Sequence, residues 1–339
     1  MNLRVGFVGC GWISTYQIEG WRQIPDVEVV AVCDREAARA HRLALQYGIP
    51  WSGDDAARMM EKCKLDILDI ATPPRSHKDL ALSAVERGIH VLCQKPAALT
   101  LADATEMIRC ADQHRVVLYI NEMLRFCPWF QQTHKLLQEN SVGRVVFARL
   151  FSRTHGFLKV GPSRNLMYGF REFLKWADRG IMLEETIHFL DVMRYFFGTP
   201  KTIYAITEHL SPLLKGEDVA TIMLRYEGMT AVIEDSWSAH GPARSGLEVE
   251  GAEGAVFLSH GKALELYSGQ QGGIEETWDY SGTSWDEQRP KVFASLYKDF
   301  LQAISSEGDR TAQAKDNLET LRLTLAAYES AEAGKEVKL

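Results

Sequence analysis

The sequence predicts an α/β protein in two parts: a doubly wound parallel sheet, then an α+β domain with a large, mainly antiparallel sheet. Two observations favour this fold class. In the first 122 residues, short apolar runs alternate with helix-like stretches, which is typical of parallel strands joined by crossover helices. Beyond residue 123, strand-like runs follow one another directly, as they do in antiparallel sheets.

Composition narrows the class of protein. The chain has 339 residues, 46% of them hydrophobic and 24% charged, which suits about two globular domains. Its formal net charge of -7 argues against a nucleic-acid partner, because phosphate binding needs a basic surface. No apolar run approaches the roughly 18 residues of a membrane span. The N-terminal segment, which begins MNLRVGFVGC, is apolar, but Gly6, Gly9 and Gly11 interrupt it. We therefore expect a strand there and no signal peptide.

Cysteine usage favours the cytoplasm. All six cysteines lie in the first 127 residues, and no two form a C-x-x-C pair. A zinc or redox site therefore has little support. We expect reduced core cysteines, as in a cytoplasmic protein, and no metal site.

A glycine motif follows the first strand-like run. RVGFV passes into Gly9-x-Gly11-x-x-Ser14, a helical pattern follows, and a second apolar run, VEVVAVC, ends at Asp34. This strand–turn–helix–strand order is the context of a dinucleotide-binding, or Rossmann, domain. Gly9 permits the tight turn, Gly11 lets the backbone approach a pyrophosphate, and the helix N-terminus offers free N–H groups to that anion. Ser14 replaces the usual third glycine and is small enough for close packing.

Asp34 favours NAD as the cofactor. It lies about 20 residues after the glycine turn, where a carboxylate accepts a hydrogen bond from the ribose 2′-hydroxyl and repels a 2′-phosphate. The adjacent Arg35 keeps NADP open as an alternative.

Further strand-like runs at 65–72, 88–96 and 116–123 carry polar residues near their carboxyl ends. In a doubly wound sheet, ligands bind at the carboxyl ends of the strands. Lys95 is notable because it ends a strand and precedes a proline, which holds its backbone extended. The expected cofactor site comprises Gly9, Gly11, Trp12, Ile13, Asp34, Arg35, Thr72, Pro73, His77, Gln94, Lys95 and Asn121.

The second part has a different pattern. We expect strands at 143–153, 201–210, 218–228, 229–239, 246–254 and 255–260, and helices again in 290–331. If one face of this sheet is apolar and exposed, it suits a subunit interface. The sequence therefore favours a homo-oligomer, a dimer or tetramer, that associates through the sheet.

MLEETIHFLD, residues 182–191, is a helix-like stretch rich in ionisable residues. At about 100° per residue, Glu184 and His188 fall on one side and Glu185 points elsewhere. The spacing Glu185-x-x-His188 occurs in di-iron helices, but that site needs a second such motif, which the chain lacks. Two readings stay open: a partly solvated amphipathic helix, or an acid–base pair, for which histidine is well suited near neutral pH.

Together these motifs resemble the Gfo/Idh/MocA oxidoreductases, which act on sugars, inositols and related polyols with NAD(P). The resemblance covers nearly the whole chain and is carried in order by VGFVGCGWIS, VVAVCDRE, LDILDIATPPRSH, GIHVLCQKPAALT, NEMLRFCPWF, EETIHFLDVMRYFFG and LAAYESAEAGKEV. It implies a Rossmann domain over 1–122, a substrate-binding and oligomerisation domain over 123–287, and C-terminal helices, 288–339, that pack back on the first domain.

The resemblance also implies catalytic roles. Lys95 matches the family lysine that hydrogen-bonds the reacting hydroxyl, His188 the proton acceptor, and Glu184 a position that many members fill with aspartate. Gln94 replaces the usual glutamate before the lysine. The expected reaction moves a hydride between NAD(P) and a hydroxyl or carbonyl of a free sugar, cyclitol or related polyol.

Candidate substrate residues come from the segment before that helix and from the helix itself. They are Arg153, His155, Arg164, Tyr168, Trp176, Glu184 and His188. Two alternatives to the dehydrogenase remain: an NAD-dependent glycosidase of the same fold, and a non-catalytic regulator that senses sugar or NAD.

Overall fold

The computed structural model describes residues 2–154, 174, 177–239, 241–259, 262–282 and 284–339. They group into two compact units. Residues 1–126 and 286–321 form unit 1, and residues 127–285 and 322–339 form unit 2. The second half of the last long helix therefore groups with unit 2.

Unit 1 contains a six-stranded sheet in the order β3-β2-β1-β4-β5-β6, with every neighbouring pair parallel. This is the doubly wound order that reverses beside β1. The strands are β1 (Leu3–Val8), β2 (Val27–Cys33), β3 (Trp51–Gly53), β4 (Ile67–Ile70), β5 (His90–Gln94) and β6 (Leu118–Asn121). All their carboxyl ends lie at one edge of the sheet.

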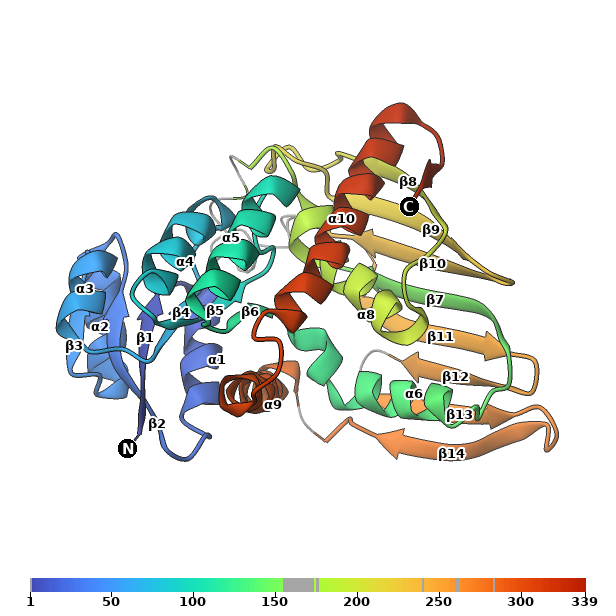
Figure 1. Cartoon of the computed structure of the whole chain (residues 1–339). Helices are drawn as coiled ribbons and strands as arrows, with labels where there is room; N and C mark the ends of the chain where they lie inside the picture. The colour runs from blue at the N-terminus through green and yellow to red at the C-terminus, as the bar shows by residue number, and fades with distance from the viewer. Residues whose placement is uncertain (1, 155–173, 175–176, 240, 260–261, 283) are drawn as a thin grey trace. The chain divides into compact units, whose positions relative to one another are not determined.

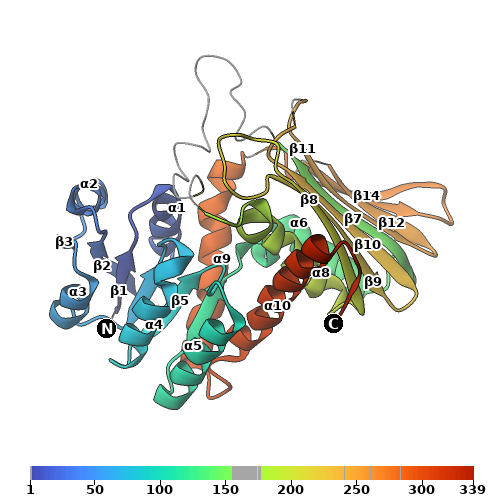
Figure 2. The ribbon, with the colours of Figure 1, turned by 90° about the horizontal axis from the view of Figure 1, so that it is seen from above.

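Helices cover both faces of this sheet. Figure 2 shows α1, α2 and α9 on one face and α3, α4 and α5 on the other. Their bounds are α1 (Trp12–Trp21), α2 (Ala37–Tyr47), α3 (Ala56–Lys62), α4 (His77–Val85), α5 (Leu101–His114) and α9 (Trp285–Ser305). Short 3₁₀ turns, η1 (Pro74–Ser76) and η2 (Met123–Phe126), follow β4 and β6. Because helices bury both faces of the sheet, nearly every residue of these strands is apolar, and the strands appear in the sequence as nearly continuous apolar runs.

One polar residue lies in the middle of this core. Asp69, on β4, is fully buried, and its carboxyl oxygens accept hydrogen bonds from Gln17 (3.1 Å) and from the Trp21 indole (2.7 Å). The Trp21 ring stacks on Tyr297 of α9 with centroids 4.0 Å apart. Burial raises the pKa of the Asp69 carboxyl to about 7. The cluster joins α1, β4 and α9, three elements that are distant in sequence.

Unit 2 contains a nine-stranded sheet in the order β14-β13-β12-β11-β7-β10-β9-β8-β15. All neighbours are antiparallel except β7 and β10, which run parallel. The strands are β7 (Val145–Arg153), β8 (Thr202–Glu208), β9 (Val219–Tyr226), β10 (Met229–Ser236), β11 (Arg244–Gly251), β12 (Gly254–Ser259), β13 (Ala263–Ser268), β14 (Gly273–Asp279) and β15 (Val337–Lys338).

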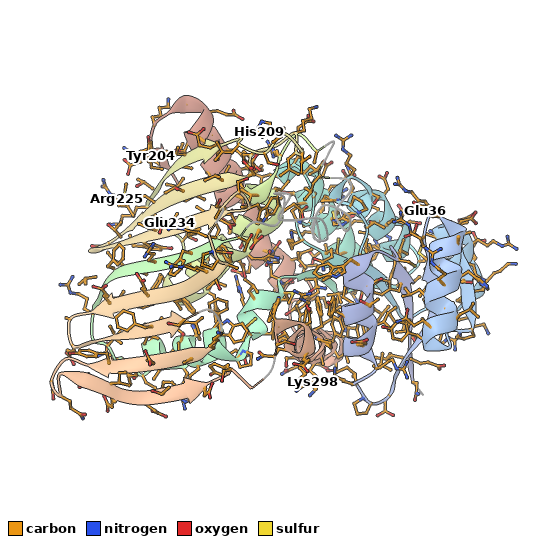
Figure 3. The ribbon with its side chains drawn as sticks, turned by 180° about the vertical axis from the view of Figure 1, so that it is seen from behind. Glu36, Tyr204, His209, Arg225, Glu234 and Lys298 are labelled. Atoms are coloured by element: carbon orange, nitrogen blue, oxygen red, sulfur yellow. The ribbon has the colours of Figure 1, made fainter. Side chains whose placement is uncertain are left out.

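One face of this sheet is covered and the other is open. Figure 1 shows α6 (Pro128–Gln138), α8 (Ile187–Phe197) and part of α10 (Ala312–Ala333) in front of the strands. A π-helical turn, η4 (Met182–Thr186), leads directly into α8. From behind, in Figure 3, the strands that carry Tyr204, Arg225 and Glu234 have no helix in front of them.

The predicted fold class is confirmed: a parallel Rossmann sheet and a second, mainly antiparallel sheet. The sequence missed four strands, β3, β13, β14 and β15, together with helix α6. β3 and β15 have only three and two residues, and β14, GIEETWD, is an exposed edge strand that lacks a run of buried positions. No helix in the described part of the chain is long and apolar enough to cross a membrane.

Candidate functional site

The two glycines of the N-terminal turn have different roles. Gly9 has φ +102°, and a Cβ there would lie 2.5 Å from the Ala71 carbonyl oxygen, so the fold itself requires glycine. Gly11, just before α1, has nothing within 4 Å of the position of a Cβ. Packing of the described residues therefore gives no reason for glycine at Gly11. The open space beside the helix N-terminus fits the pyrophosphate of a dinucleotide.

Asp34 is held in place at the end of β2. One carboxylate oxygen accepts a hydrogen bond from the Cys10 backbone N–H at 2.7 Å, and the other accepts one from the Glu36 N–H at 2.9 Å. The first bond ties the carboxylate to the glycine turn, beside which a ribose-binding acid is expected. Arg35 is exposed beside it.

The thiols beside this turn are neutral at physiological pH. Burial, reinforced by the Asp34 carboxylate, raises the pKa of Cys10 and that of Cys33 to about 12. They add no negative charge where a phosphate would bind. All six cysteines are free thiols, five of them buried.

The predicted loop residues lie at the same edge. Thr72 and Pro73 follow β4, and the Thr72 hydroxyl accepts a hydrogen bond from the Ser76 hydroxyl at 2.8 Å. Gln94 ends β5, and its side-chain oxygen accepts a hydrogen bond from the Lys95 backbone N–H at 2.9 Å. Lys95 is half-buried and comes directly after β5. The edge thus gathers the predicted cofactor residues around the glycine turn.

His77 supports these loops. Its fully buried ring has Nδ1 at 2.9 Å from the Pro96 carbonyl oxygen and Nε2 at 2.8 Å from the Thr72 carbonyl oxygen. The imidazole therefore bridges the loop after β4 and the loop after β5. This contact with both loops gives His77 a supporting position, rather than an exposed one, in the predicted cofactor site.

Asn121 stands out at the end of β6. Its side chain is fully buried, yet neither its amide nitrogen nor its oxygen has a hydrogen-bond partner among the described residues. A buried amide without partners costs roughly 1–3 kcal/mol. Because Asn121 pairs in register with Gln94 at the carboxyl edge, a bound ligand is a natural source of the missing bonds.

The helix with the acid–base candidates begins with the π turn η4. Glu184 is buried in that turn, and His188 is half-buried in the first turn of α8. A π turn widens the helix so that residues four or five apart share a side, and such turns are frequent at functional sites. Glu185 points into unit 2 and accepts hydrogen bonds from the Trp237 indole and, at 3.3 Å, the Ser152 hydroxyl.

Glu217 fixes the start of this helix. Its Oε1 accepts hydrogen bonds from the backbone N–H groups of Gly180 (3.0 Å) and Met182 (3.1 Å) and from the Tyr328 hydroxyl (2.6 Å). Burial and the Glu217 carboxylate raise the pKa of Tyr328, so the phenol stays protonated and donates a hydrogen bond to the carboxylate. A carboxylate here satisfies N–H groups that a helix start leaves unpaired.

One substrate candidate lies on a different face of the sheet from the helix. Arg153, the last residue of β7, lies on the open face of the sheet, where it forms an ion pair with Glu234. Its neighbour Ser152 points to the opposite face, toward Glu185 of the helix. Because side chains alternate along a strand, Arg153 and Ser152 lie on opposite faces of the sheet. Four other candidates lie outside the described residues: His155, Arg164, Tyr168 and Trp176.

Sequence reasoning also missed Arg289 of α9, whose guanidinium lies over the Trp12 and Tyr16 rings of α1. No local motif signals it, because its partners come from the other end of the chain.

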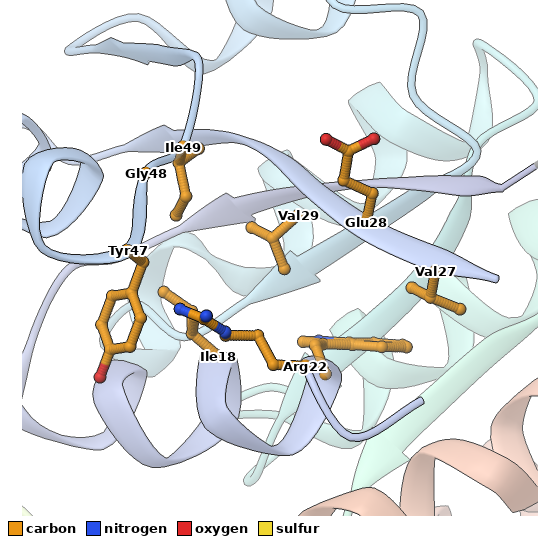
Figure 4. Close-up of a pocket in the computed structure, with 9 residues that line it drawn as sticks. Ile18, Arg22, Val27, Glu28, Val29, Tyr47, Gly48 and Ile49 are labelled. Carbon is orange, nitrogen blue, oxygen red and sulfur yellow. The ribbon is translucent and has the colours of Figure 1, made fainter. Parts of the chain in front are cut away.

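A pocket of about 250 Å³ lies elsewhere in unit 1. Figure 4 shows it between α1, the start of β2 and the end of α2, with Arg22, Glu28 and Tyr47 around it. Because it adjoins the amino end of β2, it is at the opposite edge of the sheet from the glycine turn. It is therefore separate from the predicted cofactor site. Within the described ranges, no group of three or more His, Cys, Asp or Glu side chains is arranged to hold a metal ion.

The fold and the glycine edge define a nucleotide-binding α/β protein with a second sheet domain. A family model described as the oxidoreductase family with an NAD-binding Rossmann fold matches residues 3–122, and the GFO/IDH/MocA C-terminal domain model matches residues 130–257. The chain belongs to the GFO/IDH/MocA oxidoreductase family, which confirms the resemblance, and its Rossmann domain is of the NAD-binding kind.

Individual relatives agree over almost the full length. A D-apiose dehydrogenase from Paraburkholderia graminis is 31% identical and covers 98% of this chain and 88% of its own. A 1,5-anhydro-D-fructose reductase from Ensifer adhaerens is 27% identical, and the match covers 99% of this chain and 98% of the reductase. The chain is also similar to the solved structure of an oxidoreductase from Agrobacterium radiobacter in complex with NAD+, L-tartaric acid and magnesium. The TM-score is 0.88 at 28% identity, and the match covers 100% of this chain and 98% of that one.

Proposed function

We propose that this protein is an NAD-dependent dehydrogenase that acts on a CH–OH group of a free sugar, cyclitol or related polyol. A catalytic role of Lys95 is supported by its position: it lies one residue after β5, on the edge of the sheet that also holds the glycine turn and Asp34. The named relatives act on apiose, anhydrofructose and inositol. They support a carbohydrate substrate and make D-apiose the first sugar to test.

In the proposed reaction, the glycine turn and Asp34 would hold NAD, which would supply the hydride acceptor for the substrate carbon. The Lys95 ammonium donates a hydrogen bond to the reacting oxygen and stabilises its developing negative charge. The His188 imidazole accepts the hydroxyl proton as general base. Glu184, buried one turn before His188, orients the imidazole or a second hydroxyl. The carboxylate of Asp34 favours NAD over NADP, because it would repel a 2′-phosphate.

The test is an NADH absorbance assay with D-apiose, other aldoses, inositols and sugar acids, each with NAD or NADP. On the best substrate, Lys95→Met and His188→Ala should each lower kcat by about 10²- to 10⁴-fold. His41→Ala, at an exposed position of α2, is the control and should keep full activity. Full turnover by either Lys95→Met or His188→Ala would refute the catalytic assignment.

The same assay separates the alternatives. Cleavage of a glycoside without net NADH formation would identify an NAD-dependent glycosidase. Sugar and NAD binding without any turnover would identify a sensor.

We also propose a homo-oligomer, a dimer or tetramer, that associates through the open face of the nine-stranded sheet. Its support is a set of exposed apolar side chains there, including Ile206 (49% exposed) and Met223 (44% exposed). A cytoplasmic location is part of the same proposal and is supported by six free cysteines, which suit a reducing compartment.

A further inference from the structure

The acid expected to bind the cofactor ribose is held between two elements. One oxygen of Asp34 accepts a hydrogen bond from the Cys10 N–H of the glycine turn at 2.7 Å. The other accepts one from the Glu36 N–H, at the start of α2, at 2.9 Å. The first turn of α2 therefore adjoins the ribose end of the predicted cofactor site, as the glycine turn does.

Arg39 brings a positive charge to this corner of unit 1. It belongs to the first turn of α2. Burial and the Asp34 carboxylate raise the pKa of the Cys10 thiol, and the Arg39 charge opposes them. The guanidinium is therefore within electrostatic reach of the turn that holds Asp34. An arginine near such a carboxylate is the group with which Rossmann domains accept the 2′-phosphate of NADP.

Glu36, which Figure 3 labels, binds this arginine in a bidentate pair. Arg39 Nε donates to Glu36 Oε2 at 2.9 Å, and Arg39 Nη2 lies 2.9 Å from Oε1. Exposed ion pairs contribute little on average, but two parallel, charge-assisted hydrogen bonds fix the geometry of both side chains. The Glu36 side chain makes no capping hydrogen bond to α2. Its contacts therefore serve to hold Arg39.

We propose that Glu36 is a second determinant of cofactor choice and acts through Arg39. Asp34 repels a 2′-phosphate directly, whereas Glu36 occupies the arginine that would otherwise pair with that phosphate. A 2′-hydroxyl needs only the acceptor that Asp34 provides, so the pair leaves NAD binding intact. This inference rests on the proposed NAD site and deepens its preference for NAD over NADP; it does not depend on which sugar is oxidised.

Calorimetry on the full chain without cofactor tests the proposal by comparing ADP-ribose with 2′-phospho-ADP-ribose. Glu36→Gln should strengthen binding of 2′-phospho-ADP-ribose about tenfold at low salt, as expected for one new hydrogen bond between charged groups. The gain should shrink as salt rises, because both partners are exposed. ADP-ribose affinity should stay nearly the same, since Asp34 keeps both of its backbone donors.

Arg39→Met separates two ways in which Glu36 can act. If Glu36 acts by holding Arg39, the gain of Glu36→Gln disappears in the double variant Glu36→Gln/Arg39→Met. If Glu36 only repels the phosphate by its own charge, the gain survives in the double variant, and the proposal is overturned. Unchanged binding of 2′-phospho-ADP-ribose in Glu36→Gln also overturns it.

Glu61→Gln, on the exposed surface of α3, is the matched control and should change neither affinity. Failure of the proposed function gives a different result from failure of this inference. A wild-type protein that binds neither ligand would reject the nucleotide site and the inference together. A wild-type protein that binds ADP-ribose but oxidises no sugar would reject the dehydrogenase alone, and the Glu36 and Arg39 variants would still decide the inference.

Discussion

The two glycines of the nucleotide turn allow a sharp contrast between folding and binding. Gly9→Ala should destabilise the protein, because it places a side chain at φ +102° and within 2.5 Å of the Ala71 carbonyl oxygen. The left-handed backbone alone costs about 1–2 kcal/mol. Urea unfolding of Gly9→Ala measures this loss of stability.

Gly11→Ala should behave in the opposite way. With nothing within 4 Å of the new methyl group, the free energy of unfolding should stay within about 0.5 kcal/mol of wild type. The methyl group would occupy the space expected for the pyrophosphate, so NAD affinity should fall at least tenfold by calorimetry. Unchanged NAD affinity in Gly11→Ala would contradict the placement of the pyrophosphate.

Asp69 makes the stability of unit 1 depend on pH. Its pKa is raised from 3.8 to about 7 in the folded state, mainly by burial, which disfavours the charged carboxylate. The folded state therefore binds this proton more tightly than the unfolded state. The stability linked to this proton is fully present below the unfolded pKa, falls as pH rises, and is lost once pH passes the folded pKa of about 7.

Asp69→Asn should remove that dependence. An amide keeps an acceptor for the Trp21 indole and can donate to the Gln17 side-chain oxygen, which has no partner among the described residues. Relative to wild type, Asp69→Asn should gain on the order of 4 kcal/mol between about pH 4 and pH 7 and remain constant above that. Paired urea titrations across this range measure the difference. A constant difference at all pH values would show that the Asp69 pKa is not raised.

Single residues differ in how well sequence predicts them. Asp34 and Lys95 could be predicted because parallel strands bring their carboxyl ends to one edge, so a residue that ends a strand is placed by the sheet. Asp69, Arg289 and Glu217 could not, because each depends on partners from distant segments. The sequence offers Arg153 as a substrate candidate, and strand alternation places its side chain on the open face of the sheet.

At the level of elements, the helix that carries Glu184 and His188 depends on one distant carboxylate. Glu217 accepts two backbone N–H groups at the helix start and the Tyr328 hydroxyl, all on a single oxygen. A periodicity of 100° per residue predicted a helix here but not the π turn, because a π turn depends on such contacts and leaves no mark in the apolar pattern.

Glu217→Ala should therefore destabilise unit 2 by about 2–4 kcal/mol, since it leaves buried donors without acceptors. Glu217→Gln keeps the side-chain oxygen and should cost less than half as much. Urea unfolding measures both, and hydrogen exchange should show faster exchange of the amides of 180–188 in Glu217→Ala. Equal losses in the two variants would mean that the carboxylate charge, not the acceptor, stabilises the helix.

The sheets show the same division between local and distant information. Alternating runs and helices predicted the parallel sheet of unit 1, because each crossover helix is visible in the sequence. The order of the second sheet could not be predicted, because β7 pairs with β10 and β11 rather than with the strand that follows it.

For the molecule as a whole, the open face of the second sheet matters most. Its central charges are paired within the chain: Arg149 forms ion pairs with Glu234 (2.5 Å) and Glu248 (3.4 Å), and Arg153 also pairs with Glu234. Because these charges are already paired, burying them under a second subunit costs less desolvation free energy than burying unpaired charges. Around them lie Met223 and, directly opposite on β8, Tyr204, which Figure 3 shows near Arg225.

An oligomer through this face should dissociate when a new charge is placed in it. Met223→Arg puts an unpaired cation at the centre of the apolar part, and burying such a charge costs several kcal/mol. Size-exclusion chromatography with light scattering should show an oligomer for wild type and monomer for Met223→Arg. Leu45→Arg is the control, since Leu45 is 71% exposed on α2 of the other unit, and it should leave the oligomer intact. A wild-type monomer at micromolar concentration, or an intact Met223→Arg oligomer, would exclude this face as the interface.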